Sequence, residues 1–243
     1  MIDLLFLAKG RPEFTRASFA ALYANTNWDL VEKIHIYTDG GLFECRSSTG
    51  NIPLNYRMNE DLFGGPVAIM NHFLSQPGED IFCKVDNDCI CPPGWLEQCL
   101  AVMEAHPELD LLGIEPPASR TPNPHSSIRR VRYPEEGLTG TGYARCDSIG
   151  GIGLMRRSAF ANRPPMNPHG FNGVGGFTNW QTETADVCKG WVVPPLKLFL
   201  LDRLPMEPWC SLSKKYIAEG IQRPWTQYPD SAKHLWEWWL QRD

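Results

Sequence analysis

Two carboxylates stand two positions apart at the end of an apolar run in the first half of the chain. Residues 81–85 read Ile-Phe-Cys-Lys-Val, and Asp86, Asn87 and Asp88 follow directly. Two carboxylates held this close repel each other unless a cation lies beside them. Oxygen ligands of this kind select a hard ion such as Mg²⁺ or Mn²⁺, which can also bridge a diphosphate. The motif therefore predicts a divalent-metal site, with a solvated turn after a strand as the alternative interpretation.

A second pair of acids lies toward the end of the chain. Glu183 and Asp186 stand three positions apart, within a segment around residues 181–189 that we expect to be helical. Acids at this spacing lie on neighbouring positions of a helix surface. From the residues alone, such a pair can simply be two solvated helical acids.

The segments that must position these acids alternate between strands and helices. Strands are predicted by short apolar runs at residues 2–8, 33–38, 81–85 and 110–114. Helices are predicted by apolar residues at helical spacing, beginning near Pro12, Pro66 and Trp95. This alternation predicts an α/β fold with a mostly parallel central sheet and helices on both faces. Ligands of such sheets bind at the carboxyl ends of the strands, which is where Asp86 stands.

Residues 116–147 interrupt this alternation. They contain five prolines and a cluster of three arginines, Arg129, Arg130 and Arg132. A loop of this length in a compact domain is usually functional or mobile. The arginines indicate either a phosphate-binding patch or a solvated loop edge. We expect regular structure to resume near Ile149, with strands within residues 191–201.

Composition describes a globular chain without a strong charge bias. The 243 residues are 42% hydrophobic and 21% charged, and the formal net charge is −5. This charge gives no global attraction to nucleic acid or to an anionic membrane. No apolar run approaches a membrane span. The apolar stretch from Leu4 to Ala8 follows the acid Asp3 and precedes the basic residues Lys9 and Arg11, which is the reverse of the charge order of a secretory signal. We therefore expect a cytoplasmic protein without a membrane partner.

The eight cysteines show no metal-binding spacing. None forms a CxxC pair, and Cys89 with Cys91 lacks a matching second pair. A zinc site is therefore not expected. We expect most of these cysteines to be reduced residues of the core, as free cysteines usually are in a reducing compartment.

Several motifs, taken in order over residues 2–204, resemble those of the GT-A glycosyltransferases, in the large inverting nucleotide-sugar family. A Lys/Arg-Pro segment follows the first strand, an acid follows the second, and an asparagine lies in the helix before the metal motif. The matching residues here are Lys9 and Arg11, Asp39, and Asn71. The segment from Lys84 to Asp88, followed by Pro93-Gly94-Trp95-Leu96, is similar to the metal motif and the helix after it.

The resemblance implies transfer of a sugar from a nucleotide diphosphate sugar, such as a UDP-sugar, to a hydroxyl acceptor with Mn²⁺ or Mg²⁺. The implied metal ligands are Asp86 and Asp88, and the implied donor-binding residues are Lys9, Arg11, Asp39, Asn71, Lys84 and Asp86. The family often has a histidine as third ligand after the last core strand. Here Asp202 stands in that region, where it can either replace the histidine or pair with a neighbour such as Arg203.

The resemblance extends to the acceptor side. Residues 150–157 are similar to the family's acceptor-side strand, although their glycines equally suit a closely packed strand. Residues 180–191 resemble the helix that carries the general base, for which Glu183 is the first choice and Asp186 the second. In the family the two acids are adjacent, whereas here they are separated.

The resemblance also predicts how the chain is organised. A GT-A domain would span residues 1–204, with the donor part in about residues 1–115 and the acceptor part in 116–204, and a Trp-rich extension would follow at 205–243. The small size is similar to bacteriophage enzymes that modify either hydroxymethylated pyrimidines in DNA or phage proteins. The arginine cluster and the tryptophans favour modified DNA as acceptor. The acidic net charge opposes it, so the acceptor stays open between DNA and protein.

Two other functions compete with glycosyl transfer. Nucleotidyl transfer onto a sugar phosphate also uses α/β sheets and acids, but it normally shows a glycine-rich basic loop after the first strand, and residues 8–11 are too sparse for one. A non-catalytic carbohydrate- or nucleotide-binding domain is the other alternative. The missing histidine and the separated acids Glu183 and Asp186 are the features that keep it open.

Overall fold

The computed structural model describes residues 1–8, 12–38, 57–59, 66–114, 141–146, 148–149, 152–167, 176–193 and 199–200. The strands in these ranges are β1 (Ile2–Ala8), β2 (Val31–Thr38), β3 (Arg57–Asn59), β4 (Ile81–Asp86), β5 (Cys89–Ile90), β6 (Leu111–Gly113), β7 (Gly142–Arg145), β8 (Ile152–Arg156), β9 (Lys189–Val193) and β10 (Phe199–Leu200). The α-helices are α1 (Pro12–Asn25), α2 (Pro66–Ser75), α3 (Trp95–Ala105) and α4 (Gly176–Glu183). Short 3-10 helices follow α1 at Trp28–Leu30 and β8 at Arg157–Phe160.

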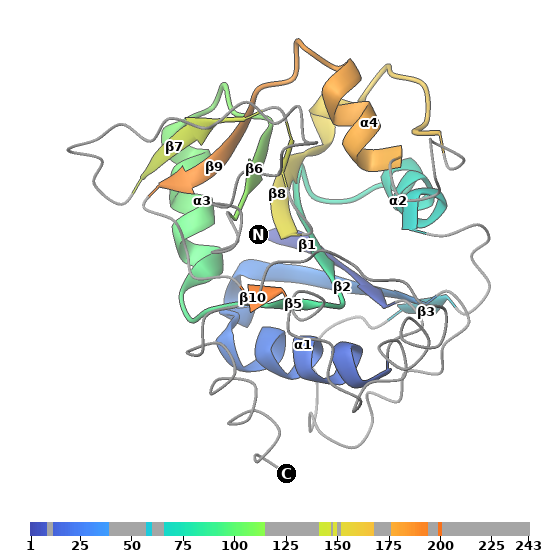
Figure 1. The fold of residues 1–243 in the computed structure, drawn as a ribbon, viewed down its shortest axis with the longest axis vertical. Helices are drawn as coiled ribbons and strands as arrows, with labels where there is room; N and C mark the ends of the chain where they lie inside the picture. The colour runs from blue at the N-terminus through green and yellow to red at the C-terminus, as the bar shows by residue number, and fades with distance from the viewer. Residues whose placement is uncertain are drawn as a thin grey trace, which may run out of the picture.

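Eight of the described strands form one mixed sheet, shown in Figure 1, in the order β3-β2-β1-β4-β8-β6-β9-β7. The strands β3, β2, β1 and β4 are parallel to one another. The strand β8 runs antiparallel between β4 and β6, and β9 is parallel to β6. The edge strand β7 is antiparallel to β9. Six of these eight strands therefore share one direction, which confirms the predicted mostly parallel α/β sheet.

Helices cover both faces of this sheet, and β1 is therefore buried on both sides. Its residues alternate between two core clusters, as the two-residue period of a strand requires. Leu4 and Phe6 pack in one cluster with residues of α1 and α3. Leu5 and Leu7 pack in the other cluster with residues of α2 and α4. Figure 1 shows α1 and α3 on one side and α2 and α4 on the other, as predicted.

The predicted helix at residues 181–189 is wrong in its bounds. The helix α4 ends at Glu183, and Lys189 already begins β9. Directly after the helix, the Thr184 hydroxyl donates a 2.8 Å hydrogen bond back to the carbonyl of Trp180. The buried Lys189 ammonium then donates to the carbonyls of Thr184 and Val187 in the turn that follows. Side-chain bonds to the backbone thus compete with continuation of the helix.

A second correction concerns residues 116–147, which the sequence predicts to be a loop. Residues 142–145 of this segment form β7, which pairs with β9 from Gly142 opposite Val193 to Arg145 opposite Gly190. The strand is short and lies at the edge of the sheet, so it carries little of the apolar alternation that marks longer strands. Its stability depends on a partner that lies far along the chain.

A small second sheet joins β5 to β10, with Leu200 opposite Cys89 and Phe199 opposite Ile90. The described thiols are free, and those of Cys83, Cys89, Cys91 and Cys99 are buried. Burial raises the pKa of each of these four thiols, which keeps them protonated. None of the helices in the described ranges is both long and apolar enough to cross a bilayer.

Candidate functional site

Three neighbouring parallel strands end together where the predicted donor-binding residues begin. The last residue of β1, Ala8, lies opposite Thr38, the last residue of β2. One residue earlier on β1, Leu7 lies opposite Asp86, the last residue of β4. The predicted residues Lys9, Arg11 and Asp39 follow β1 and β2 in sequence but lie outside the described residues. Ala8 and Thr38, the last described residues before these segments, therefore lie at the same carboxyl edge of the sheet as Asp86.

A buried lysine orients the carboxylate of Asp86. The Lys84 ammonium donates a 2.6 Å hydrogen bond to Asp86 Oδ1, and the two side chains are 7% and 32% exposed. The same ammonium lies 5.7 Å from the centre of the Phe177 ring in the first turn of α4. A buried ammonium needs an anionic partner, so Lys84 fixes the position of Asp86. Asp86 thus ends β4 with its carboxylate held but still open to solvent.

The turn after Asp86 is fastened to α1 by its buried middle residue. Asn87 is 1% exposed, and its amide donates a 2.7 Å hydrogen bond to the hydroxyl of Thr15. The hydroxyl of Ser18, one helical turn later, lies 2.6 Å from the carbonyl of Cys89 and 3.3 Å from that of Asp86. These bonds hold the turn at both ends, so Asn87 points inward while the acids on either side are half-buried.

Sequence reasoning missed Thr15, Ser18 and Asn87. A signal for the first two was present, because they stand three residues apart on a helix whose neighbouring residues Phe19 and Leu22 belong to the core. Polar residues on the buried face of a helix need hydrogen-bond partners. The partners are on a turn about seventy residues away, which no local pattern reveals.

The donor atoms of this turn fit a hard divalent cation. The carboxylates of Asp86 and Asp88 supply the oxygen ligands that Mg²⁺ and Mn²⁺ prefer, although Lys84 already engages one oxygen of Asp86. Within the described ranges, no three His, Cys, Asp or Glu side chains converge on one point. Asp202, the predicted third ligand, lies outside the described residues. It follows Leu200 by two positions, and Leu200 pairs with Cys89 next to Asp88.

Asn71 is engaged with the protein backbone. Its amide donates a 2.7 Å hydrogen bond to the carbonyl of Met166 and accepts a 2.9 Å bond from the N–H of the same residue. This pair of bonds ties α2 to the segment that follows β8. The predicted contact of Asn71 with a donor stays a prediction.

The two acids of the predicted general base occupy different environments. Glu183 is the last residue of α4 and is exposed, whereas Asp186 lies in the following turn. The guanidinium of Arg163 forms an ion pair with Asp186, and this hydrogen bond is the main cause that lowers the pKa of Asp186. A carboxylate with a lowered pKa is a weaker base. Because α4 ends at Glu183, Asp186 lies outside the helix. The two acids thus do not share a helix surface, contrary to the expectation from their spacing.

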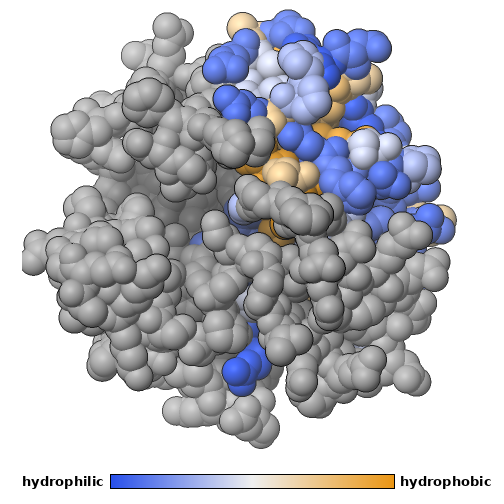
Figure 2. Space-filling view, turned by 90° about the vertical axis from the view of Figure 1, so that its right-hand side faces the viewer, coloured by the Kyte–Doolittle hydropathy of each residue, from blue (hydrophilic) through white to orange (hydrophobic). Residues whose placement is uncertain are grey.

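Aromatic rings attach α4 to the site. The ring of Trp180 stacks with those of Phe160 and Phe177, with ring centres 4.4 and 6.2 Å away. Phe177 in turn lies beside Lys84, the partner of Asp86. Figure 2 shows the side of the molecule that carries α2 and α4, where the described surface is mostly hydrophilic around a smaller hydrophobic area. The helix that carries Glu183 thus begins next to the predicted metal motif.

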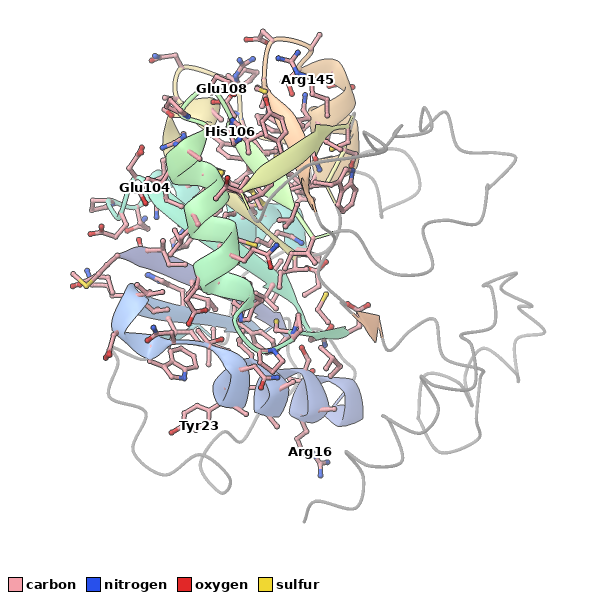
Figure 3. The ribbon with its side chains drawn as sticks, turned by 90° about the vertical axis from the view of Figure 1, so that its left-hand side faces the viewer. Arg16, Tyr23, Glu104, His106, Glu108 and Arg145 are labelled. Carbon is pink, nitrogen blue, oxygen red and sulfur yellow. The ribbon has the colours of Figure 1, made fainter. Side chains whose placement is uncertain are left out.

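A separate polar cluster lies at the carboxyl end of α3, where Figure 3 labels Glu104, His106 and Glu108. The ring nitrogens of His106 lie 3.2 Å from the carboxylate of Glu108 and 3.0 Å from the carbonyl of Thr141. The Tyr143 hydroxyl donates a 3.2 Å bond to Glu108. These contacts attach the start of β7 to α3 and involve none of the predicted site residues.

Residues 45–163, just under half of the chain, match the family described as Glycosyl transferase family 2. The matched range includes Asp86, Asn87 and Asp88. No curated protein matches the chain in sequence.

Among solved structures, the chain is similar to S. aureus TarS 1–349, with a TM-score of 0.56 and 12% identity over 82% of this chain and 60% of that one. It is also similar to S. aureus TarS 1–349 in complex with UDP-GlcNAc, with a TM-score of 0.53 and 12% identity over 82% and 58%. GalNAc-T7 with UDP, GalNAc and Mn²⁺ gives a TM-score of 0.52 and 10% identity over 81% and 42%. The chain thus spans about three fifths of TarS 1–349 and less than half of GalNAc-T7. These likenesses establish the fold, which is the GT-A type of α/β fold.

Proposed function

We propose that the protein is a metal-dependent glycosyltransferase that moves a sugar from a nucleotide diphosphate sugar to a hydroxyl acceptor. The observation that carries the proposal is the position of Asp86 and Asp88 at the carboxyl end of β4, beside the ends of β1 and β2. The family match covers this motif. TarS bound to UDP-GlcNAc and GalNAc-T7 bound to UDP, GalNAc and Mn²⁺ support a UDP-sugar as donor and Mn²⁺ or Mg²⁺ as metal.

Asp86 and Asp88 are the residues that would hold the metal. Because Lys84 engages one oxygen of Asp86, we expect Asp88 to contribute more to metal affinity. Asp202 is our candidate for a third ligand, and the pairing of Leu200 with Cys89 supports it, since two further residues of chain span about 7 Å. A bound divalent cation stabilises the charge that develops on a leaving diphosphate.

The donor would bind over the ends of β1 and β2. We assign Asp39 to the nucleobase, Lys9 and Arg11 to the charged diphosphate, and Asn71 and Lys84 to the walls around it. Asp39→Ala should weaken binding of free UDP as much as binding of a UDP-sugar. An unchanged affinity for UDP in this variant would count against the assignment of Asp39.

We assign the general base to Glu183, with Asp186 as the second choice. Glu183 is exposed at the end of α4, whereas Asp186 is engaged by Arg163. In an inverting transfer, this carboxylate takes the proton of the acceptor hydroxyl as it attacks the anomeric carbon. Glu183→Gln should bind UDP normally and lose about a hundredfold to ten-thousandfold in transfer rate. Normal turnover would move the role to Asp186 or elsewhere.

The transferred group is a hexosyl or pentosyl sugar, and the acceptor supplies a free hydroxyl. Hydroxymethylated pyrimidine in phage DNA is an alternative that depends on Arg129, Arg130 and Arg132, which lie outside the described residues. That alternative predicts binding of modified duplex DNA that weakens with salt and with replacement of all three arginines. Binding that is insensitive to both changes contradicts it.

The function is tested by ligand-dependent melting and by hydrolysis. A ligand that binds only the folded protein raises its melting temperature. UDP and UDP-sugars should raise the melting temperature of this protein more with Mn²⁺ than without it, and slow hydrolysis of the UDP-sugar should stop when a chelator is added. If no nucleotide changes the melting temperature, or if hydrolysis continues with chelator, the proposal is wrong. A non-catalytic binding domain would show the melting shift without hydrolysis.

A further inference from the structure

Gln181 in α4 has a buried side chain whose two polar atoms differ in their hydrogen bonding. The side chain is 1% exposed, and its carboxamide oxygen accepts a 2.7 Å hydrogen bond from the backbone N–H of Ile149. Its carboxamide nitrogen is buried and has no hydrogen-bond partner among the residues that the structure describes. Leaving a buried N–H donor unpaired costs free energy, and a methionine of similar length would fill the space without that cost. Packing alone therefore does not account for a glutamine here.

Ile149, whose N–H bonds to Gln181, lies against β8, the strand that pairs with β4. The Ile149 side chain covers two glycines, because a Cβ on Gly153 would lie 2.6 Å from Ile149 Cδ1 and one on Gly113 would lie 2.7 Å from Ile149 Cβ. Gly153 lies opposite Lys84 in the pairing of β8 with β4. The bond from Ile149 to Gln181 thus connects α4 to the strand pair that ends at Asp86.

The same helix presents Glu183 to solvent. Successive residues of an α-helix are about 100° apart around its axis, so side chains two positions apart point about 200° apart. Gln181 is accordingly buried while Glu183 is exposed. The aromatic contacts of Trp180 hold the helix by packing, whereas the bond of Gln181 is directional. A directional bond on the buried side fixes the rotation of the helix and therefore the direction of Glu183.

We infer that Gln181 is a positioning residue, whose carboxamide oxygen sets the orientation of Glu183 relative to Asp86 and Asp88 through the N–H of Ile149. This inference rests on the proposed function, because the role of Glu183 as general base belongs to it. The nucleotide itself would bind over β1, β2 and β4, away from this bond. Loss of the bond should therefore reduce the rate of transfer and leave nucleotide affinity in place.

The test compares Gln181→Met with Gln181→Glu. The methionine fills the space but removes the acceptor, whereas the glutamate keeps an oxygen for the N–H of Ile149. Asp110→Ala is the matched control, because it removes the carboxylate that accepts a 2.8 Å hydrogen bond from the N–H of Cys188 at the amino edge of the sheet. Amide hydrogen exchange over residues 148–156 is measured together with UDP affinity in Mn²⁺, and with kcat and KM for the UDP-sugar.

We expect Gln181→Met to speed exchange over residues 148–156 and to lower kcat by about tenfold to a hundredfold, with UDP affinity within about twofold of the original protein. Gln181→Glu should restore most of the protection and of kcat, and Asp110→Ala should leave both unchanged. Unchanged exchange or unchanged kcat in Gln181→Met overturns the inference, as does an equal loss in Gln181→Glu. If the original protein transfers no sugar, the proposed function fails, and the exchange measurement still decides whether Gln181 holds Ile149.

Discussion

Two ion pairs stand at opposite ends of the neighbouring strands β1 and β4. Near the amino edge, Asp3 of β1 pairs with Arg157, and their side chains are 2% and 15% exposed. At the carboxyl edge, Asp86 of β4 pairs with Lys84, and their side chains are 32% and 7% exposed. The acid is therefore the enclosed partner in the first pair and the accessible partner in the second. The first geometry suits cohesion of the fold, and the second suits contact with a ligand.

The Asp3–Arg157 pair belongs to a larger network of hydrogen bonds. Each nitrogen of the Arg157 guanidinium donates to an oxygen of the protein, at 2.8–3.3 Å. The acceptors besides Asp3 are carbonyls of Phe73, Gln76 and Glu79. The guanidinium also lies 4.4 Å from the centre of the Phe73 ring. This network joins β1, the end of α2 and the end of β8, so we expect its role to be structural.

The difference shows that the role of an ion pair in this sheet depends on which of its two partners is accessible to solvent. When one partner of a buried ion pair is removed, the other charge stays buried and unpaired, which is strongly destabilising. A charge that is accessible to solvent is instead hydrated by water. The two pairs should therefore respond to mutation in opposite ways. Stability should depend mainly on Arg157, and ligand binding mainly on the acids near Lys84.

The largest effect on stability is expected for Arg157→Met. The substitution leaves the Asp3 carboxylate buried and leaves several carbonyls without their donor. The free energy of unfolding should fall by about 3–5 kcal/mol, measured by urea denaturation. A loss below about 1 kcal/mol, the range of exposed pairs, would show that this network does not hold the fold.

A smaller loss is expected for Gly78→Ala, which tests how tightly the same network is enclosed. A Cβ at residue 78 would overlap Asp3 Oδ2 and would lie 2.5 Å from Arg157 Nη2. The free energy of unfolding should fall by about 1–3 kcal/mol, as for other overpacked sites. Pro77→Ala, at the exposed neighbouring position, serves as the control. Equal stability of the two variants would contradict the close packing around Asp3.

The corresponding change at the carboxyl edge is Lys84→Met. It removes the partner of Asp86, but the carboxylate left behind is accessible to water. We expect unfolding free energy to fall by about 1 kcal/mol, because an accessible charge is easily rehydrated. UDP affinity in Mn²⁺ should fall, since Asp86 is no longer held in place. If Lys84→Met loses as much unfolding free energy as Arg157→Met and still binds UDP normally, then the Lys84–Asp86 pair stabilises the fold and does not serve ligand binding.

The smallest effect is expected for Arg163→Ala, which removes the partner of Asp186. The pKa of Asp186 is lowered chiefly by its hydrogen bond from Arg163. A lowered pKa in the folded state contributes stability above the ordinary carboxyl pKa, and this contribution is lost as pH falls through the folded value. In Arg163→Ala the Asp186 carboxyl should titrate at higher pH in an NMR titration. A shift to lower pH, or none, would contradict the assigned cause.

The sequence predicts the parts of the fold that have a strong local pattern. The bounds of β1 agree with the apolar run at residues 2–8, and the strand predicted at residues 81–85 does run into Asp86. Both are buried strands whose residues are uniformly apolar or nearly so. Position at the carboxyl edge of the sheet follows from the alternation of strands and helices.

Other features depend on distant partners and leave no local pattern. The edge strand β7 forms only against β9, and Asn87 is buried because Thr15 accepts its amide proton. Beyond the end of α4 at Glu183, the turn is held by side-chain bonds of Thr184 and Lys189, which hydrophobic periodicity does not predict. The first case depends on backbone pairing between strands, the second on a bond between two side chains, and the third on bonds from side chains to the backbone. Each of them requires knowledge of the tertiary structure.

The most direct test of the central claim is calorimetric binding of UDP to Asp88→Ala, with and without Mn²⁺. Asp88 lies at the accessible end of the turn, while Asn87 and Ser18 hold the backbone, so the fold should persist with an unchanged melting temperature. We predict that Mn²⁺ strengthens UDP binding to the original protein and no longer does so in the variant. If the variant keeps the full Mn²⁺-dependent gain in UDP affinity, Asp88 is not a metal ligand and the account of this site is wrong.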